Sequence, residues 1–423
     1  MQTKPRIVPK GMMIQFLVLS SCFAWWGLAN NMTDPLVKAF TGIYKNMSTF
    51  ESSLIQFAFY GAYFCLAIPG AMINRKYSYK HGVLVGLGVY ILGCFLFYPA
   101  SLTHNFYFFL LAFYVLAGGL TILETAADPY VLSIGPEETA TQRLNLAQSF
   151  NPVGSIVGTL MCQVFILKEL EDFRSDTSGL NAEAIQANEL SIVVMPYVGV
   201  GLFLILVWLL IAFMKMPHAD AHAETPDHDC NLGDSVRRLL KNKNYVFAVV
   251  AQFFYVGVQI SAWTYTVYYI PAQLGIKDSE SLRYHTVALV LFAIMRWVCT
   301  GLMSYINPSK LLLVMSLGAI ACSAVVIFVG GIVGVWALIG ISACMSLMFP
   351  TIFGLGTKGL GQDTKIGGSG IIMAILGGAL IPLIQAKVID ISNVNYSYVI
   401  PMICFVVIAA FAAYSSREQV VGA

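Results

Sequence analysis

The chain alternates between long apolar blocks and short polar stretches along its whole length. About twelve such blocks occur, each roughly as long as the 20 residues that a helix needs to cross a bilayer. A membrane-spanning strand would be about half as long and would alternate apolar and polar positions, whereas these blocks are apolar on all sides. The pattern therefore predicts an all-α polytopic membrane protein with about twelve transmembrane helices. The blocks occupy residues 12–33, 51–73, 82–101, 105–132, 144–167, 191–214, 245–270, 284–304, 310–330, 332–355, 367–388 and 397–415.

A long polar stretch at mid-chain divides these blocks into two sets. We predict an N-terminal six-helix bundle at 1–214, a cytoplasmic linker at 215–244 and a C-terminal six-helix bundle at 245–423. A weak internal repeat supports the division, because pairs of residues recur at the same spacing in both halves. These pairs are Gln15 and Trp26 with Gln252 and Trp263, and Pro129 and Gly135 with Pro350 and Gly356. Two six-helix halves in the same order are typical of parallel repeats in transporters.

Lysine and arginine residues indicate the orientation of the chain. They are more frequent in the polar stretches on the side of the N-terminus than in those on the opposite side. Such residues accumulate on the cytoplasmic side of membrane proteins. We therefore predict that both termini are cytoplasmic.

Composition agrees with a membrane location and excludes several other classes of protein. Of the 423 residues, 58% are hydrophobic and 11% are charged, against roughly 25% charged in an average soluble domain. The formal net charge of +2 creates no strong field that would favour nucleic acid. The sequence has no metal-ligand spacing, phosphate loop or nucleophile motif. We therefore expect no metal, no cofactor and no enzymatic activity.

Carboxylates inside the apolar blocks are the strongest pointers to function. A charge at membrane depth is costly unless it is paired, hydrated or neutralised. Asp34 lies at the outer end of the first helix, and Glu124 and Asp128 lie one helical turn apart in the fourth. We interpret all three as candidate groups for proton coupling. Each has a structural alternative: Asp34 lies in the water interface, Asp128 caps or pairs, and Glu124 pairs with Arg143 or Arg296.

Amide and aromatic side chains form a second group of candidates. An amide carries both donors and acceptors, which suits a ligand with several hydroxyl groups, and the apolar C–H faces of sugars lie against aromatic rings. The alternative is that the amides join neighbouring helices and that the rings pack or form interfacial belts. We also expect Asn145 to lie with two of these amides along one side of the fifth helix. The candidates for binding a small polar solute are Asn31, Glu124, Gln148, Asn151, Gln259 and Trp263.

Six short stretches are specific when taken together. They are FAWWGLANNMTDPL (23–36), SYKHG (78–82), LETAADPYV (123–131), RLNLAQSFNPVGS (143–155), AQFFYVGVQISAW (251–263) and FPTIFGLGTKGLGQDTK (349–365). With them the chain resembles the fucose–galactose–glucose:proton symporter family of the major facilitator superfamily. The likeness runs from Phe23 to Gly378. The stretch that contains Gln259 resembles the fucose branch more than the glucose and galactose branch.

The resemblance implies the major facilitator fold, with two bundles around a central cavity and alternating access. It implies import of a sugar with protons, of L-fucose in first place, with glucose/galactose:proton symport as the alternative. A drug exporter of this fold would lack the amide-rich fifth helix, and a passive channel would not need a buried Glu124. We expect a monomer in the bacterial inner membrane, with a sugar, protons and the lipid bilayer as its partners.

The resemblance also implies roles for individual residues. Asp34 and Glu124 match the family's coupling carboxylates, and Asn31, Gln148 and Asn151 match its amides. We expect Glu124 to respond to both sugar and proton, and Asp34 to drive proton-coupled turnover. Asp128 departs from the family, because the fucose branch has asparagine at this position, and it adds a third titratable group.

Overall fold

The structure is a computed structural model that describes residues 5–44, 49–175, 177, 179–215, 232–276 and 278–421. Within these ranges the side chains of 33–39, 41, 49–53, 267, 278–279, 282 and 418–421 lie outside the description. Asp34 is among them: its backbone belongs to the first helix, but its side chain is not placed. Residues 216–231, which form much of the predicted linker, are also outside the described residues.

Helices make up nearly all of the described chain, and no strand occurs in these ranges. Twelve helical segments of the described chain are long and apolar enough to cross a membrane, as the hydrophobic pattern predicts. The first six segments contain α1 (Met13–Ile43), α2 (Thr49–Lys76), α3 (Tyr79–Thr103), α4 (Phe106–Ser133), η1 (Glu137–Thr139), α5 (Ala140–Gln148), α6 (Asn151–Cys162), η2 (Gln163–Lys168), α7 (Glu169–Ser175) and α8 (Ala182–Phe213).

The second half of the chain repeats this organisation with shorter helices. The elements are α9 (Leu232–Lys241), α10 (Lys243–Thr264), α11 (Thr266–Leu274), α12 (Asp278–Leu302), α13 (Pro308–Phe328), α14 (Gly331–Met345), α15 (Met348–Thr357), η4 (Gly361–Asp363), α16 (Thr364–Met373), η5 (Ala374–Leu376), α17 (Gly377–Ile391), α18 (Val394–Ser397) and α19 (Val399–Val421).

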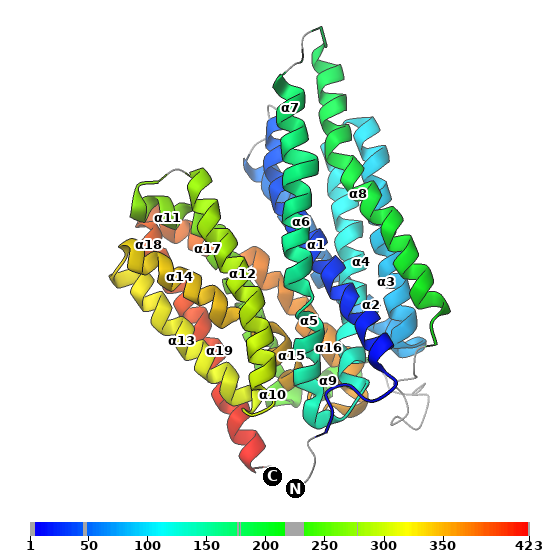
Figure 1. Ribbon diagram of the computed structural model, residues 1–423. Helices are drawn as coiled ribbons and strands as arrows, with labels where there is room; N and C mark the ends of the chain where they lie inside the picture. Colours follow the sequence, from blue (N-terminus) through cyan, green and yellow to red (C-terminus); the bar gives the residue numbers. More distant parts are fainter. Residues whose placement is uncertain are drawn as a thin grey trace.

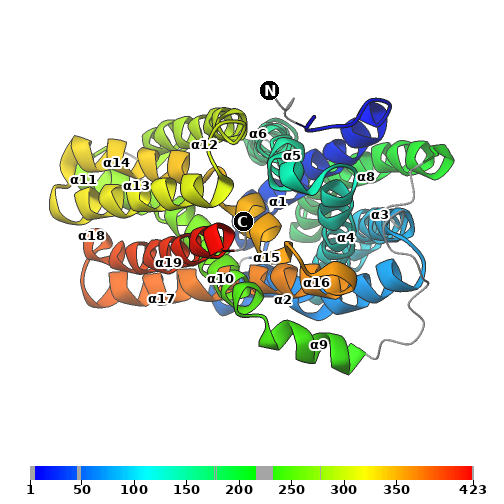
Figure 2. The same ribbon diagram turned by 90° about the horizontal axis from the view of Figure 1, so that it is seen from below.

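The helices form two halves that converge at one end of the molecule. The halves meet near the ends where α1 begins and α19 ends, which we call the closed side, and they diverge toward α7 and α11, which we call the open side (Figure 1). Seen from the closed side, α15 and α16 extend from the C-terminal half to the N-terminal half (Figure 2). There α15 packs against α5, and α16 packs against α2 and α4.

Hydrogen bonds join the two halves on the closed side. The Gln142 amide donates to the Thr300 carbonyl at 2.8 Å and to the Ser304 hydroxyl at 2.7 Å. Asn145 donates to the Thr351 hydroxyl at 3.1 Å. These bonds form only while α5 stays against α12 and α15, so they stabilise the closure.

One helix lies within the segment that we predicted as a linker. Helix α9 lies on the closed side, where Figure 2 shows it at the lower edge of the view, and it contacts α16. Arg238 of α9 donates to both carboxylate oxygens of Asp363, at 2.7 and 2.8 Å, in the bidentate geometry that arginine favours. The described part of the linker is therefore attached to the C-terminal half rather than free of it.

Candidate functional site

Glu124 lies in a narrow pocket between α1 and α4. It is only 4% exposed, and its Oε2 atom has no hydrogen-bond partner. Trp26, across the pocket, donates from Nε1 to the Tyr63 hydroxyl at 2.5 Å. A buried carboxyl with a free oxygen can take up a proton or accept a hydrogen bond from a hydroxyl group of a ligand. The pocket is lined by Cys22, Phe23, Trp26, Leu123, Glu124 and Ala127.

Asp128 lies one turn further along α4 and is fully buried. Gln148 of α5 donates from Nε2 to Asp128 Oδ1 at 2.9 Å, whereas Asp128 Oδ2 has no partner. Among the described side chains, no ion pair involves Glu124 or Asp128. The two carboxyls therefore share the interior of the N-terminal half without a cation to neutralise them.

Neither arginine that we considered as a partner for Glu124 takes that role. Arg143 of α5 donates to the carbonyls of Val131, Gly135 and Pro136, at 2.7, 3.1 and 3.3 Å. It therefore binds backbone carbonyls at the end of α4, where the last carbonyls of a helix lack helical donors, and in the turn that follows. Arg296 of α12 also binds carbonyl groups, and its contacts join the two halves.

Arg296 bridges one carbonyl from each half of the molecule. Its Nη1 atom donates to the Gln148 carbonyl at 3.0 Å, and its Nε atom donates to the Ser346 carbonyl at 2.5 Å. The guanidinium lies 4.7 Å from the centre of the Phe292 ring, within the range of a cation–π contact. Gln148 thus binds Asp128 through its side chain and Arg296 through its backbone.

Proline residues leave these two carbonyls without a helical donor. Pro152 stands four residues after Gln148, and Pro350 stands four residues after Ser346. Because proline has no N–H, it cannot make the bond from residue i to residue i−4 that would occupy these oxygens. The helices are interrupted at the same places, between α5 and α6 and between α14 and α15. The cation of Arg296 therefore satisfies buried backbone groups that would otherwise be unpaired.

We predict that Arg296→Met weakens the closed side. Each carbonyl left unpaired in the buried interface costs about 1–3 kcal/mol, whereas opening this side would hydrate both. Thr141 lies against the other half, because a Cβ atom on Gly354 would lie 2.7 Å from the Thr141 hydroxyl oxygen. In the Arg296→Met protein, a cysteine placed at position 141 should become about tenfold more reactive toward a permeant maleimide. The control is Lys310→Met, which removes an exposed cation at the start of α13 and should leave the labelling rate unchanged. Equal labelling rates in the Arg296→Met protein and the unsubstituted one would contradict the bridging role.

Two candidate amides contact the backbone of α1. Asn151 begins α6 at a point where α6 touches α1 closely: a Cβ atom on Gly27 would lie 2.2 Å from the Asn151 carbonyl oxygen. The Asn151 Nδ2 atom lies 3.4 Å from the Phe23 carbonyl oxygen, a weak hydrogen bond. Asn31 donates to the Gly27 carbonyl at 3.0 Å. Both side chains are half-buried, and their carbonyl partners, Phe23 and Gly27, stand on either side of Trp26 along α1.

The remaining candidates lie on α10 in the C-terminal half. Trp263 donates from Nε1 to the Ser342 hydroxyl at 3.1 Å, and its ring centre lies 5.1 Å from that of Phe292. Gln259 is half-buried one turn before Trp263. Since Phe292 also lies against Arg296, this aromatic cluster is continuous with the bridge between the halves.

The amides of the fifth span have three different partners. The helix is interrupted between Gln148 and Asn151, so Asn145, Gln148 and Asn151 do not lie along one continuous helix as we expected. Asn145 binds the other half, Gln148 binds Asp128, and Asn151 binds α1. The proline after Asn151 is the signal in the sequence that could have revealed the interruption.

Comparison with known proteins identifies the family of the chain. The sequence model of the Major Facilitator Superfamily matches residues 15–382. This chain belongs to the major facilitator superfamily. The predicted major facilitator fold, with twelve transmembrane helices, is thereby confirmed.

Within the superfamily, several proteins are similar to this one along most of their length. Proteins named L-fucose-proton symporter from Haemophilus influenzae and Escherichia coli K12 are each 38% identical over 96% of this chain, which covers 97% and 93% of their own lengths. The glucose/galactose transporter of Brucella abortus is 32% identical over 95% of this chain and 93% of its own. A crystal structure of FucP in the outward conformation matches 95% of this chain and 99% of its own, with 37% identity and a TM-score of 0.86.

Proposed function

We propose that this protein imports L-fucose together with protons. The observation that carries the proposal is the 38% identity to two L-fucose-proton symporters over nearly the whole chain, against 32% for the glucose/galactose transporter. The buried carboxyls support it, since Glu124 and Asp128 can hold protons where no cation is paired with them. Glucose/galactose:proton symport is the alternative.

We place the closed side of the molecule in the cytoplasm of a bacterial inner membrane, with both termini on that side. The excess of lysine and arginine on the side of the N-terminus supports this orientation. The halves then diverge toward the outside, as expected of a state that accepts sugar from the medium. The similarity to FucP in its outward conformation supports the same assignment.

Sugar binding is assigned to polar groups of both halves. Glu124 offers a free carboxyl oxygen, and Asn31 and Asn151 hold only single contacts to carbonyls of α1. A sugar hydroxyl can replace a weak contact such as the one at 3.4 Å with a better bond. Gln148, and Gln259 with Trp263 on α10, complete the set, and the ring of Trp263 provides a surface for the apolar face of the sugar.

Alternating access requires the contacts on the closed side to break and re-form. The bonds of Gln142, Asn145 and Arg296 are few, and a typical buried hydrogen bond contributes only about 0.5–1.5 kcal/mol net. Binding of sugar and protons can shift such an equilibrium only through different affinities for the two states. We assign this difference to Glu124, Asp34 and Asp128, with the bundles 1–214 and 245–423 moving about the 215–244 linker.

Competition for uptake tests the substrate. In proteoliposomes with an inward proton gradient, unlabelled L-fucose should inhibit uptake of labelled L-fucose most strongly, D-galactose less strongly, and D-glucose least. Addition of L-fucose should also make a weakly buffered external medium more alkaline, because protons enter with the sugar. If D-glucose competes better than L-fucose, the protein belongs with the glucose/galactose transporters. Uptake without movement of protons would reject symport altogether.

A further inference from the structure

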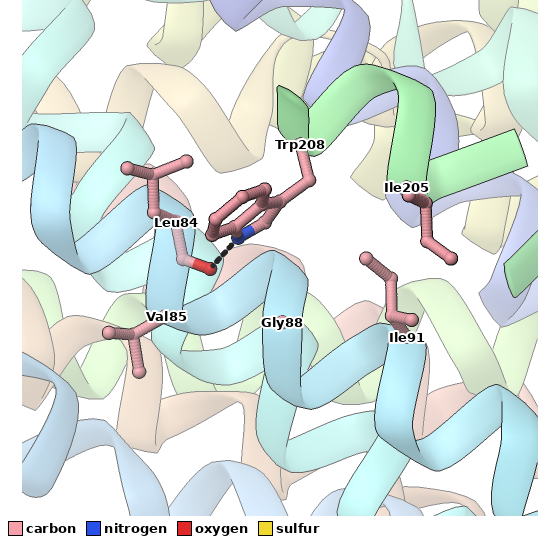
Figure 3. Close-up of a pocket in the computed structure, with 6 residues that line it drawn as sticks. All are labelled: Leu84, Val85, Gly88, Ile91, Ile205 and Trp208. Atoms are coloured by element: carbon pink, nitrogen blue, oxygen red, sulfur yellow. Dashed lines mark hydrogen bonds between the residues drawn. The ribbon is translucent and has the colours of Figure 1, made fainter. Parts of the chain in front are cut away.

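A groove of about 300 Å³ lies between α3 and α8 (Figure 3). These two helices lie on the side of the N-terminal half that is away from the C-terminal half (Figure 2). The indole Nε1 of Trp208 donates to the Leu84 carbonyl at 2.8 Å, so the polar atom of the ring is satisfied and its hydrocarbon faces the groove. The groove is separate from the pocket of Glu124, which lies between α1 and α4. Its lining is apolar and consists of Leu84, Val85, Gly88, Ile91, Ile205 and Trp208.

Gly88 lines the groove, and because glycine has no side chain, it leaves space there. A Cβ atom on Gly88 would meet only the Trp208 Nε1 atom within 4 Å, at 3.8 Å. Other glycines of α3 are in tight helix contacts: a Cβ atom on Gly86 would lie 2.4 Å from the backbone nitrogen of Leu123. Gly88 is therefore not needed for close packing of α3 against α4, and its effect is to leave space open to the bilayer.

The groove runs from the closed side into the hydrocarbon core. Leu84 and Trp208 lie at the end nearer the closed side, and Ile91 and Ile205 lie deeper. The separation of Leu84 and Ile91 along α3 is about 10 Å at 1.5 Å per residue. Trp208 stands close to the end of α8, at the level where tryptophans gather in membrane interfaces. The shape is that of a slot for one extended hydrocarbon chain.

Cations gather at the mouth of this slot. Lys80, one turn before Leu84, donates from Nζ to the carbonyls of Ala212 and Met214 at 2.9 and 2.8 Å, which brings it to the end of α8. An ammonium group has three donors, so one N–H remains for another ligand. Lys215 follows Met214 directly and is exposed. The stretches 75–81 and 212–215 contain several cations and no carboxylate.

We propose that the groove between α3 and α8 binds one acyl chain of an anionic phospholipid whose phosphate is held by Lys80 and Lys215. The slot provides the apolar contact, and the cations at its mouth provide the complementary charge. Basic sites between transmembrane helices on the cytoplasmic side recognise anionic headgroups by the same combination. The lipid would tie the start of α3 to the end of α8. This inference does not depend on which solute the protein carries.

Native mass spectrometry of the detergent-solubilised protein tests the site. With added dioleoyl phosphatidylglycerol, the unsubstituted protein should retain one lipid, and it should retain dioleoyl phosphatidylcholine far less, although the chains are identical. Gly88→Leu should fill the slot and remove the retained phosphatidylglycerol from most molecules. Lys215→Gln should weaken retention about fivefold, as expected for the loss of one cation near the phosphate.

Matched variants separate the proposed site from general effects. Gly199→Leu places the same side chain on α8 where a Cβ atom would meet nothing within 4 Å, and Lys310→Gln removes an exposed cation from the C-terminal half. Both should retain phosphatidylglycerol like the unsubstituted protein. Unchanged retention by Gly88→Leu, equal retention of the two lipids, or equal losses in Lys215→Gln and Lys310→Gln would each overturn the proposal. A thermal melt of every variant confirms that the compared proteins are folded.

Discussion

Replacing Glu124 with alanine should abolish measurable sugar binding, while glutamine should retain part of it. The carboxyl is 4% exposed in a narrow pocket, and its Oε2 atom has no protein partner, so we propose that a sugar hydroxyl binds it. Loss of one partner of a buried hydrogen bond costs about 1–3 kcal/mol, or roughly 5- to 150-fold in affinity, and more when the bond is charged. Glutamine keeps an acceptor at the same position, whereas alanine removes every polar atom.

Calorimetric titration of the purified variants with L-fucose measures this effect. The matched control is Cys22→Ala, which trims another residue of the same pocket without removing a ligand group, and it should stay within about twofold of the unsubstituted protein. A folded Glu124→Ala protein with normal affinity would show that the carboxyl binds no sugar. If Glu124→Gln and Glu124→Ala were equally impaired, the charge rather than the hydrogen bond would be the essential property.

The helices could be predicted from the sequence, but several of their limits could not. The first apolar block ends at residue 33, whereas α1 continues to Ile43. Hydropathy detects the part of a helix that lies in hydrocarbon, and the backbone hydrogen bonds continue past that limit. The same reasoning missed α9, because a short polar helix outside the membrane has no apolar block to reveal it.

The interruptions of the fifth and tenth spans show a second limit of the sequence. Pro152 and Pro350 are visible in the sequence, and each removes a donor from the carbonyl four residues earlier. Their positions predict which backbone oxygens are free. The proline positions do not predict that Arg296 binds both of these oxygens, and Gln148 lies more than a hundred residues from Arg296 in the sequence. That contact depends on how the two halves meet, which one sequence does not reveal.

The candidate carboxyls show the same distinction between local and distant relations. The spacing of Glu124 and Asp128 places them one turn apart on one helix face, and this follows from helix geometry alone. The bond from Gln148 to Asp128 joins two spans and could not be derived from spacing. Asp34 remains a prediction, since its side chain lies outside the described residues.

Replacing the other two carboxyls one at a time should separate the coupling group from the group that sets the number of protons. Asp34→Asn should lose accumulation driven by the proton gradient and keep exchange of sugar between equal pools, because sugar binding and alternating access remain. Asp128→Asn should keep its bond to Gln148, since the asparagine oxygen can accept from Nε2 as the carboxylate does. The variant then loses a proton site without losing the contact.

The size of the effect follows from the energy of the transported protons. One charge crossing a membrane potential of about 100 mV contributes about 2.3 kcal/mol, or roughly 50-fold in the limiting concentration ratio of the sugar. If Asp128 carries a proton in addition to the one coupled through Asp34, Asp128→Asn should lower the limiting ratio about 50-fold at this potential. Because we assign the coupling of all transported protons to Asp34, Asp34→Asn should lower the ratio to about one, which is equilibration without accumulation.

Proteoliposomes with a set potassium diffusion potential provide the measurement, with labelled L-fucose and a pH-sensitive dye recorded together. The protons moved per sugar should fall by one in Asp128→Asn, and the exchange rate should change little. An unchanged limiting ratio and proton count would mean that Asp128 only orients Gln148, whose carbonyl binds Arg296 on the closed side. If Asp34→Asn still concentrated the sugar, the coupling proton would have to reside on Asp128 or Glu124, and the double variant with Asp128→Asn would show which.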